Sequence, residues 1–241
     1  MIKVTIWNEF RHEKQPGHLS GKVYPDGLHA ALRDGLSAPD LEIRLASLDE
    51  PEQGLPETLL DDTDCLVWWG HKAHGEVEDT LVKRILKRVW NGMGLVVLHS
   101  GHYSKIFQAV NGTSCRLRWR EIGESCRVWC ADPSHPVAEG VPETFALEHE
   151  EMYGEPFMIA PDGHVVFYSW FKGGETFRSG VAFQRENGRI FYFQPGHETF
   201  PIYYNPDVQT VIKNAVYWAK PDCRLEKLDA PQVKKPGKDG E

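Results

Sequence analysis

Along the first 110 residues, short apolar runs alternate with segments in which apolar residues recur at helical spacing, and this pattern predicts strands separated by helices. Short, nearly continuous apolar runs are typical of strands buried on both faces, and here they cover 3–7, 41–45, 64–69 and 94–98. Apolar residues at helical spacing predict helices over 28–36, 77–90 and 103–110. Strands linked by helices favour right-handed crossovers and therefore a mostly parallel sheet.

After residue 110 the pattern changes to alternation at every second residue. It predicts half-exposed strands at 116–121, 125–132, 145–149 and 165–170. Two further strands, 181–185 and 189–193, flank Asn187-Gly188, a strong signal for a β-hairpin. A closing helix is expected over 208–220. We therefore expect one α/β domain over residues 1–220, followed by a polar, flexible tail over 221–241.

Composition and charge narrow the class of protein. Hydrophobic residues make up 41% and charged residues 26%, a globular balance that excludes disorder over most of the length. The net charge of −8, without a basic stripe, argues against nucleic acid as a partner. No apolar run approaches the roughly 20 residues that span a bilayer, and the N-terminus lacks the features of a signal peptide. An odd number of cysteines, five, indicates free thiols in the cytoplasm.

Eleven histidines are many for this length, and their positions matter more than their number. Parallel sheets bind ligands at the carboxyl ends of their strands. Any single histidine there is explained by a helix cap or a core hydrogen bond, and His18 is expected to be a loop residue. The recurrence of His71, His99 and His197 at strand ends favours a shared pocket. Five predicted strands end in polar residues: Asn8-Glu9, Gly70-His71, His99-Ser100-Gly101-His102, the segment from Glu148 to Glu155, and His197-Glu198.

Two chemistries suit such a pocket. Neutral imidazoles and a carboxylate from separate loops suit zinc or a related divalent ion. Alternatively, Ser100 follows a buried strand and precedes a helix, as a nucleophile does at its elbow, with His197 and Glu198 as the base and its orienting group. The surrounding residues lack the Gly-x-Ser-x-Gly pattern, so we favour Ser100 as a helix N-cap.

Aromatic residues border the same strand ends and indicate a carbohydrate ligand. Flat rings beside acids and imidazoles suit a pyranose, which has an apolar face and a rim of hydroxyls. The residues expected to bind the substrate are Asn8, Glu9, Trp69, His102, Tyr153 and Tyr203.

Motifs at these positions are distinctive as a set: Trp7-Asn8-Glu9-Phe10-Arg11-His12-Glu13, Tyr24-Pro25-Asp26-Gly27-Leu28-His29, Trp68-Trp69-Gly70-His71, Leu98-His99-Ser100-Gly101-His102, Glu150-Glu151-Met152-Tyr153-Gly154-Glu155 and Pro195-Gly196-His197-Glu198-Thr199-Phe200. Over about residues 1–220 they resemble the ThuA-like trehalose-utilisation family. The resemblance implies a flavodoxin-like three-layer sandwich of the class I glutamine amidotransferase type, with an antiparallel hairpin region added. It also implies a role in using trehalose or related disaccharides, including 3-keto sugars made by a partner dehydrogenase.

In that superfamily a Cys occupies the elbow between strand and helix. Here the elbow contains His99-Ser100, which excludes glutamine hydrolysis through a thiolate at that position. The resemblance implies a retained fold and a replaced chemistry.

We therefore expect a metal-dependent enzyme of sugar catabolism, an isomerase, lyase or hydrolase. The candidate ligands of a divalent metal, zinc first, are His29, His71, His99 and His197. Glu150 or Glu151 would move the proton, and Ser100 and His197 complete the catalytic candidates. On a keto sugar this equipment suits enolisation, and so isomerisation or elimination of the glycosidic bond.

Two alternatives to this enzyme stay open. The first is a metal-free Ser100-His197-Glu198 hydrolase, and the second is a non-catalytic sugar-binding or accessory protein. Tryptophans on the predicted strands permit a homo-oligomer in each case.

Overall fold

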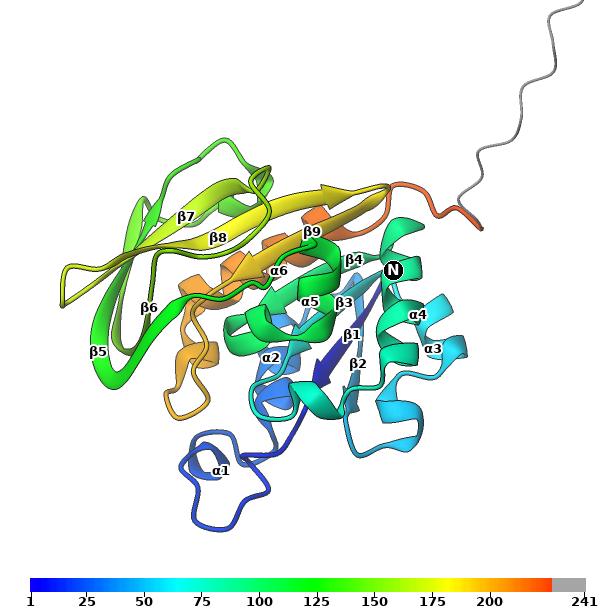
Figure 1. The fold of residues 1–241 in the computed structure, drawn as a ribbon, viewed down its shortest axis with the longest axis horizontal. Coiled ribbons are helices and arrows are strands. Elements are labelled where there is room, and N and C mark those ends of the chain that lie inside the picture. Colours follow the sequence, from blue (N-terminus) through cyan, green and yellow to red (C-terminus); the bar gives the residue numbers. More distant parts are fainter. Residues whose placement is uncertain (227–241) are drawn as a thin grey trace, which may run out of the picture.

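A computed structural model describes residues 1–226, which form a single nine-stranded sheet with helices on its faces (Figure 1). The strands are β1 (Ile2–Asn8), β2 (Leu41–Ser47), β3 (Cys65–Trp69), β4 (Gly94–Leu98), β5 (Arg118–Cys130), β6 (Thr144–Gly154), β7 (His164–Phe171), β8 (Thr176–Arg185) and β9 (Gly188–Phe193). The α-helices are α1 (Ser20–Val23), α2 (Leu28–Leu36), α3 (Glu57–Asp61), α4 (Asp79–Trp90), α5 (Lys105–Asn111) and α6 (Pro206–Ala219).

One half of the sheet is parallel. The strand order is β2-β1-β3-β4-β9-β8-β7-β5-β6, and each neighbouring pair from β2 to β9 is parallel. The chain moves outward from β1 to β2 through α2 and in the other direction from β3 to β4 through α4. Right-handed crossovers therefore place these two helices on opposite faces. α6 packs with α2, and α3 and α5 pack with α4. The predicted flavodoxin-like arrangement is confirmed.

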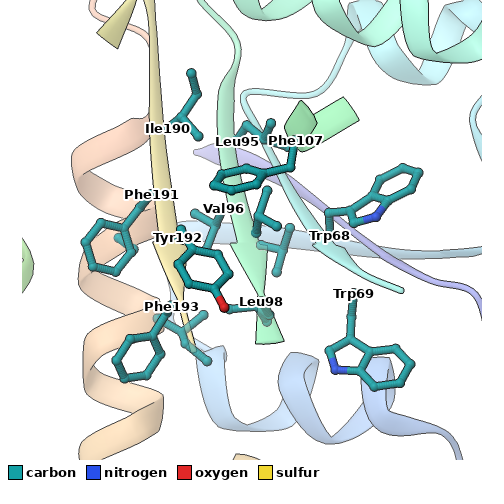
Figure 2. Packing of buried hydrophobic residues seen from close by; sticks show 14 of the residues in the cluster. Trp68, Trp69, Leu95, Val96, Leu98, Phe107, Ile190, Phe191, Tyr192 and Phe193 are labelled. Atoms are coloured by element: carbon teal, nitrogen blue, oxygen red, sulfur yellow. The ribbon is translucent and has the colours of Figure 1, made fainter. Parts of the chain in front are cut away.

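The centre of the sheet is buried on both faces, which explains its uninterrupted apolar runs. Trp68 and Trp69 on β3 are at most 1% exposed, and Leu95 to Leu98 on β4 are not exposed at all. On β9, Phe191 and Phe193 point to one face, whereas Tyr192 points to the other, where it meets Phe107 of α5 (Figure 2). This rigid centre carries the strand ends that form the site.

The antiparallel half is larger than the predicted hairpin region. From β9 to β6 every neighbouring pair is antiparallel. The two strands predicted over 116–121 and 125–132 are one long strand, β5. β6 continues to Gly154, although its polar residues had indicated a strand end after residue 149. Register shifts between β5 and β6 break the alternation there, since Glu124 pairs with Glu150 but Cys126 pairs with Leu147.

The start of the predicted tail lies against the body of the domain. The backbone N–H of Leu225 donates to Asn91 O (3.0 Å), and Arg224 pairs with Asp64 (2.5 Å). The rest of the tail, 227–241, lies outside the described residues. Within residues 1–226, none of the helices combines the length and the apolar character needed to cross a bilayer.

Candidate functional site

The ends of three adjacent parallel strands bring three imidazoles together. His71 follows β3, His99 follows β4 and His197 follows β9, and these strands are neighbours in the sheet. The ring centroid of His197 lies 5.5 Å from that of His99 and 6.3 Å from that of His71. Residues separated by up to 126 positions therefore share one site, because parallel strands deliver their carboxyl ends to one edge.

The elbow after β4 places His99, rather than Ser100, in the strained position. His99 has a φ of 48°, in the left-handed region that non-glycine residues rarely adopt. A nucleophile elbow holds its functional residue in such a turn between strand and helix. The Ser100 hydroxyl donates to Gly70 O (2.9 Å), and within residues 1–226 no hydrogen bond joins it to His197.

The N-cap of α5 is Ser104, whose Oγ accepts from the backbone N–H of Phe107 (3.2 Å). The prediction that Ser100 caps this helix is therefore wrong. A 3-10 turn over His99–Tyr103 intervenes between β4 and α5, and this delays the start of the α-helix by several residues.

A buried contact between His99 and Glu151 dominates the electrostatics of the site. His99 Nδ1 donates to the carbonyl of Gln194 (2.8 Å), and Nε2 lies 3.0 Å from Glu151 Oε2. A neutral ring held in this way turns a lone pair toward a carboxylate, so the contact requires a proton or a metal cation. Burial alone would lower the pKa of His99, but the hydrogen bond with Glu151 and the charges of Glu150 and Glu151 raise it to about 9. Burial favours protonated Glu151, yet His99 keeps the pKa of this carboxyl below its usual value.

The same side chains form a candidate metal centre. The ligand atoms of His99, Glu151 and His197 all lie within 4.8 Å of one another, and all three residues are buried. Burial lowers the pKa of His197, and it lowers the pKa of His71 to about 4, so both rings are neutral at physiological pH. His71 Nδ1 is buried and has no hydrogen-bond partner in residues 1–226. The two imidazoles and one carboxylate of this group are donor types that suit zinc, and the His71 ring lies 6.3 Å from the His197 ring between centroids.

A cavity of about 460 Å³ opens beside this group, within the size range of small-molecule sites. Its walls include His71, Ser100, His102, Trp119, Glu151 and Tyr153. His102 Nδ1 donates to Cys115 O (2.8 Å), which leaves Nε2 as a hydrogen-bond acceptor. Burial lowers the pKa of His102 to about 3, so this ring stays neutral. A larger hollow of about 950 Å³ lies along β5, but no histidine lines it.

Two predicted residues, Glu9 and Glu150, hold the backbone of the site. The carboxylate of Glu9 accepts hydrogen bonds from the N–H groups of His71 (2.7 Å), Lys72 (2.8 Å) and Ala73 (2.9 Å). The carboxylate of Glu150 accepts from the N–H groups of Gly196 (2.8 Å) and His197 (3.3 Å). The sequence predicts substrate binding by Glu9 and proton transfer by Glu150 or Glu151. In the structure the oxygens of Glu9 and Glu150 are engaged by backbone N–H groups, so each of these two side chains fixes a loop that carries a histidine.

The remaining predicted residues do not line the cavity. Trp69 is fully buried and donates to Gly196 O (3.2 Å), and Tyr203 is also fully buried. Asn8 contacts His29 (Nδ2 to Nδ1, 3.3 Å), and the His29 ring packs on Phe10. Among residues 1–226, no contact joins His29 to the other three predicted ligands.

Two residues of the site region were missed by the sequence reasoning. His12 and His18 lie in the loop after β1, where their ligand atoms form a second group with Glu198. His12 lies four residues after β1, as far as His197 lies after β9, and it stands in the motif from Trp7 to Glu13, but it was not predicted as a ligand. His18, ten residues after β1, was expected to be an ordinary loop residue. Only the packing of two distant loops brings both rings to Glu198.

The family model for trehalose utilisation matches residues 3–219 of this sequence. The chain belongs to the ThuA family. No curated protein matches it.

Solved structures similar to this ThuA-family chain show the fold alone, because their identities are low. A putative ThuA-like protein from Parabacteroides merdae is 15% identical with a TM-score of 0.64, covering 93% of this chain and 92% of its own. A cytoplasmic protein from Salmonella typhimurium LT2 is 13% identical with a TM-score of 0.63, and the match covers 91% of this chain and 100% of that protein. A glutamine amidotransferase from Thermotoga maritima is 12% identical with a TM-score of 0.51, and the match covers 90% of this chain and 97% of that protein.

Proposed function

We propose that this ThuA-family protein is a metal-dependent enzyme that acts on trehalose or a related 3-keto disaccharide. The observation that carries the proposal is the 3.0 Å contact between His99 Nε2 and Glu151 Oε2, with Nδ1 of the same ring held by a backbone carbonyl. Metal-binding histidines typically donate their other N–H in this way. We assign the ligands as His71, His99, His197 and Glu151, so that Glu151 replaces His29 of the expected set. A divalent ion there, zinc first, would polarise a sugar carbonyl or hydroxyl.

The cavity residues supply recognition of the sugar. Trp119 lines the cavity and is 65% exposed, so its indole offers a flat apolar face to a pyranose ring. His102 Nε2 can accept a hydrogen bond from a sugar hydroxyl. Tyr153 stacks on His99 with ring centroids 4.9 Å apart and forms a buried part of the cavity wall.

Proton transfer is assigned to the second oxygen of Glu151, Oε1, because Oε2 faces His99 and the assigned metal position and this residue lines the cavity. Removal of the proton on C2 of a 3-keto sugar by this carboxylate gives an enolate. Return of this proton to C3 gives the 2-keto isomer, whereas expulsion of the oxygen on C1, which takes up the proton, breaks the glycosidic bond and leaves a C1=C2 double bond. Both outcomes begin with the same C–H cleavage, so loss of the C2 proton signal detects both.

We further propose that the substrate comes from a partner sugar dehydrogenase and that the protein works in the cytoplasm. A keto group on a disaccharide requires an oxidising enzyme, which supports the first statement. The description of a similar Salmonella structure as a cytoplasmic protein supports the second.

The test combines metal analysis with a proton-exchange assay. Tag-free protein should contain zinc, and NMR in D2O should show the C2 proton signal of 3-ketotrehalose disappear, by deuterium exchange or by elimination. Chelation and Glu151→Gln should both abolish this loss, and added zinc should restore it only in the chelated wild type. His164→Ala is the matched control, because His164 is exposed and pairs with Asp132 away from the cavity. Full loss of the C2 proton signal after verified metal removal would refute metal dependence, and an unchanged signal with every keto disaccharide tested would refute the reaction.

A further inference from the structure

A second group of metal-binding side chains lies beside the first. The ligand atoms of His12, His18 and Glu198 lie within 4.8 Å of one another. The side chains of His12 and Glu198 are only 7% and 3% exposed. Two imidazoles and a carboxylate are again a donor set suited to zinc or a related ion.

Two buried atoms in this group have no hydrogen-bond partner within residues 1–226. They are His12 Nδ1 and Glu198 Oε2. His12 Nδ1 lies 2.7 Å from Glu198 Oε1, but the two groups are not oriented as a hydrogen bond. A buried polar atom left unpartnered is destabilising, and native structures keep few of them. Two such atoms within one buried cluster of ligand-type side chains are what a bound cation would satisfy.

The second imidazole is held in place by its neighbours. His18 stacks on His12 with ring centroids 4.3 Å apart, and its Nδ1 lies 2.8 Å from Ser20 Oγ. Hydrogen bonds of this kind orient the ring of a metal ligand. His18 is therefore positioned to contribute its other nitrogen.

The two groups adjoin through consecutive residues of one loop. His197 belongs to the first group, and Glu198 belongs to the second. The ring of His71 lies between them, 5.2 Å from His12 and 6.3 Å from His197 between centroids. We propose that His12, His18 and Glu198 bind a second divalent cation, so that the site is binuclear with His71 between the ions.

This inference rests on the proposed function in one respect: the proposed function supplies the first metal ion, beside which the second would bind. In two-metal sites the ions clamp two oxygens of the reacting group. The substrate class that would offer two such oxygens is a vicinal keto-alcohol, which a 3-keto sugar contains.

The test counts metal ions and does not depend on activity. Metal-free, tag-free protein is titrated with cobalt(II), followed by visible absorption, and zinc content is measured separately by elemental analysis. Wild type should take up about two equivalents, as a two-metal site requires. His18→Ala and His12→Gln should each take up about one, as should His99→Ala, and the double variant His18→Ala/His99→Ala should take up none. His164→Ala should keep both equivalents, and circular dichroism identifies any variant that fails to fold.

The outcomes separate the two proposals. One equivalent in wild type, lost in His99→Ala and kept in His18→Ala, overturns the second site and leaves the first. One equivalent lost in His18→Ala and kept in His99→Ala supports the second site and removes the metal from the proposed function. No uptake in wild type overturns both, and His12 and Glu198 then form an ion pair alone.

Discussion

The carboxylate of Glu9 provides a quantitative test of how the site is built. This side chain is 1% exposed and accepts three backbone hydrogen bonds from the loop that carries His71. Replacing Glu9 with Ala leaves three N–H groups without an acceptor. Hydrogen bonds to a charged group contribute about 1.5–3 kcal/mol each, and water can reach part of this loop, so Glu9→Ala should lower the free energy of unfolding by about 3–5 kcal/mol.

Glu9→Gln should lie between wild type and Ala. Oε2 accepts hydrogen bonds from the N–H groups of His71 and Ala73, whereas Oε1 accepts one from Lys72 alone. An amide can keep its oxygen in the first position, but its NH2 group then faces the Lys72 N–H, donor against donor. We expect this change to cost about half as much as the Ala substitution, roughly 2 kcal/mol.

The assay is urea unfolding followed by tryptophan fluorescence, at constant metal loading. The midpoint should fall in the order wild type, Gln, Ala with an unchanged denaturant slope. Glu148→Ala is the matched control, because its side chain is 92% exposed and should change stability by less than about 0.5 kcal/mol. If Glu9→Ala lowers the free energy of unfolding by less than about 1 kcal/mol and weakens sugar binding, the positioning role is refuted, and Glu9 contacts the substrate as the sequence predicts.

Further predictions concern the loop after β9. Gly196 has a φ of 150°, and a Cβ there would overlap the hydroxyl of Tyr203, so Gly196→Ala should lower stability by about 3 kcal/mol or more, whereas Gly75→Ala, which meets nothing, should not. Thermal unfolding of both variants decides this, and equal melting temperatures would contradict it. Burial raises the pKa of Glu150 to about 7, so the folded protein keeps a proton that the unfolded chain, with a pKa of 4.5, releases. Its contribution to stability is therefore full below about pH 4.5 and is lost as the pH rises through about 7. In metal-free protein the unfolding free energy should decline between pH 5 and 7.5, and Glu150→Gln should reduce this decline by up to about 3 kcal/mol. The control Glu148→Gln should leave the decline unchanged. Parallel pH profiles for wild type and Glu150→Gln would exclude the raised pKa.

The sequence alone determined the parallel half of the fold and part of the site. Hydrophobic periodicity is a local property, so it located β1, β3 and β4 to within about two residues. Strands linked by helices are parallel, so their carboxyl ends meet at one edge of the sheet. These two rules predict that His71, His99 and His197 lie together.

Only the tertiary structure decided what each polar side chain does. Glu150 and Glu151 are neighbours in the sequence, yet one holds the backbone of Gly196 and the other contacts the buried ring of His99. That assignment depends on the register shifts between β5 and β6, which no local pattern encodes. The grouping of His12 with Glu198 likewise requires two loops 186 residues apart to meet. Periodicity reports which face of an element is buried, whereas hydrogen-bond partners depend on distances of a few ångström that the packed chain alone sets.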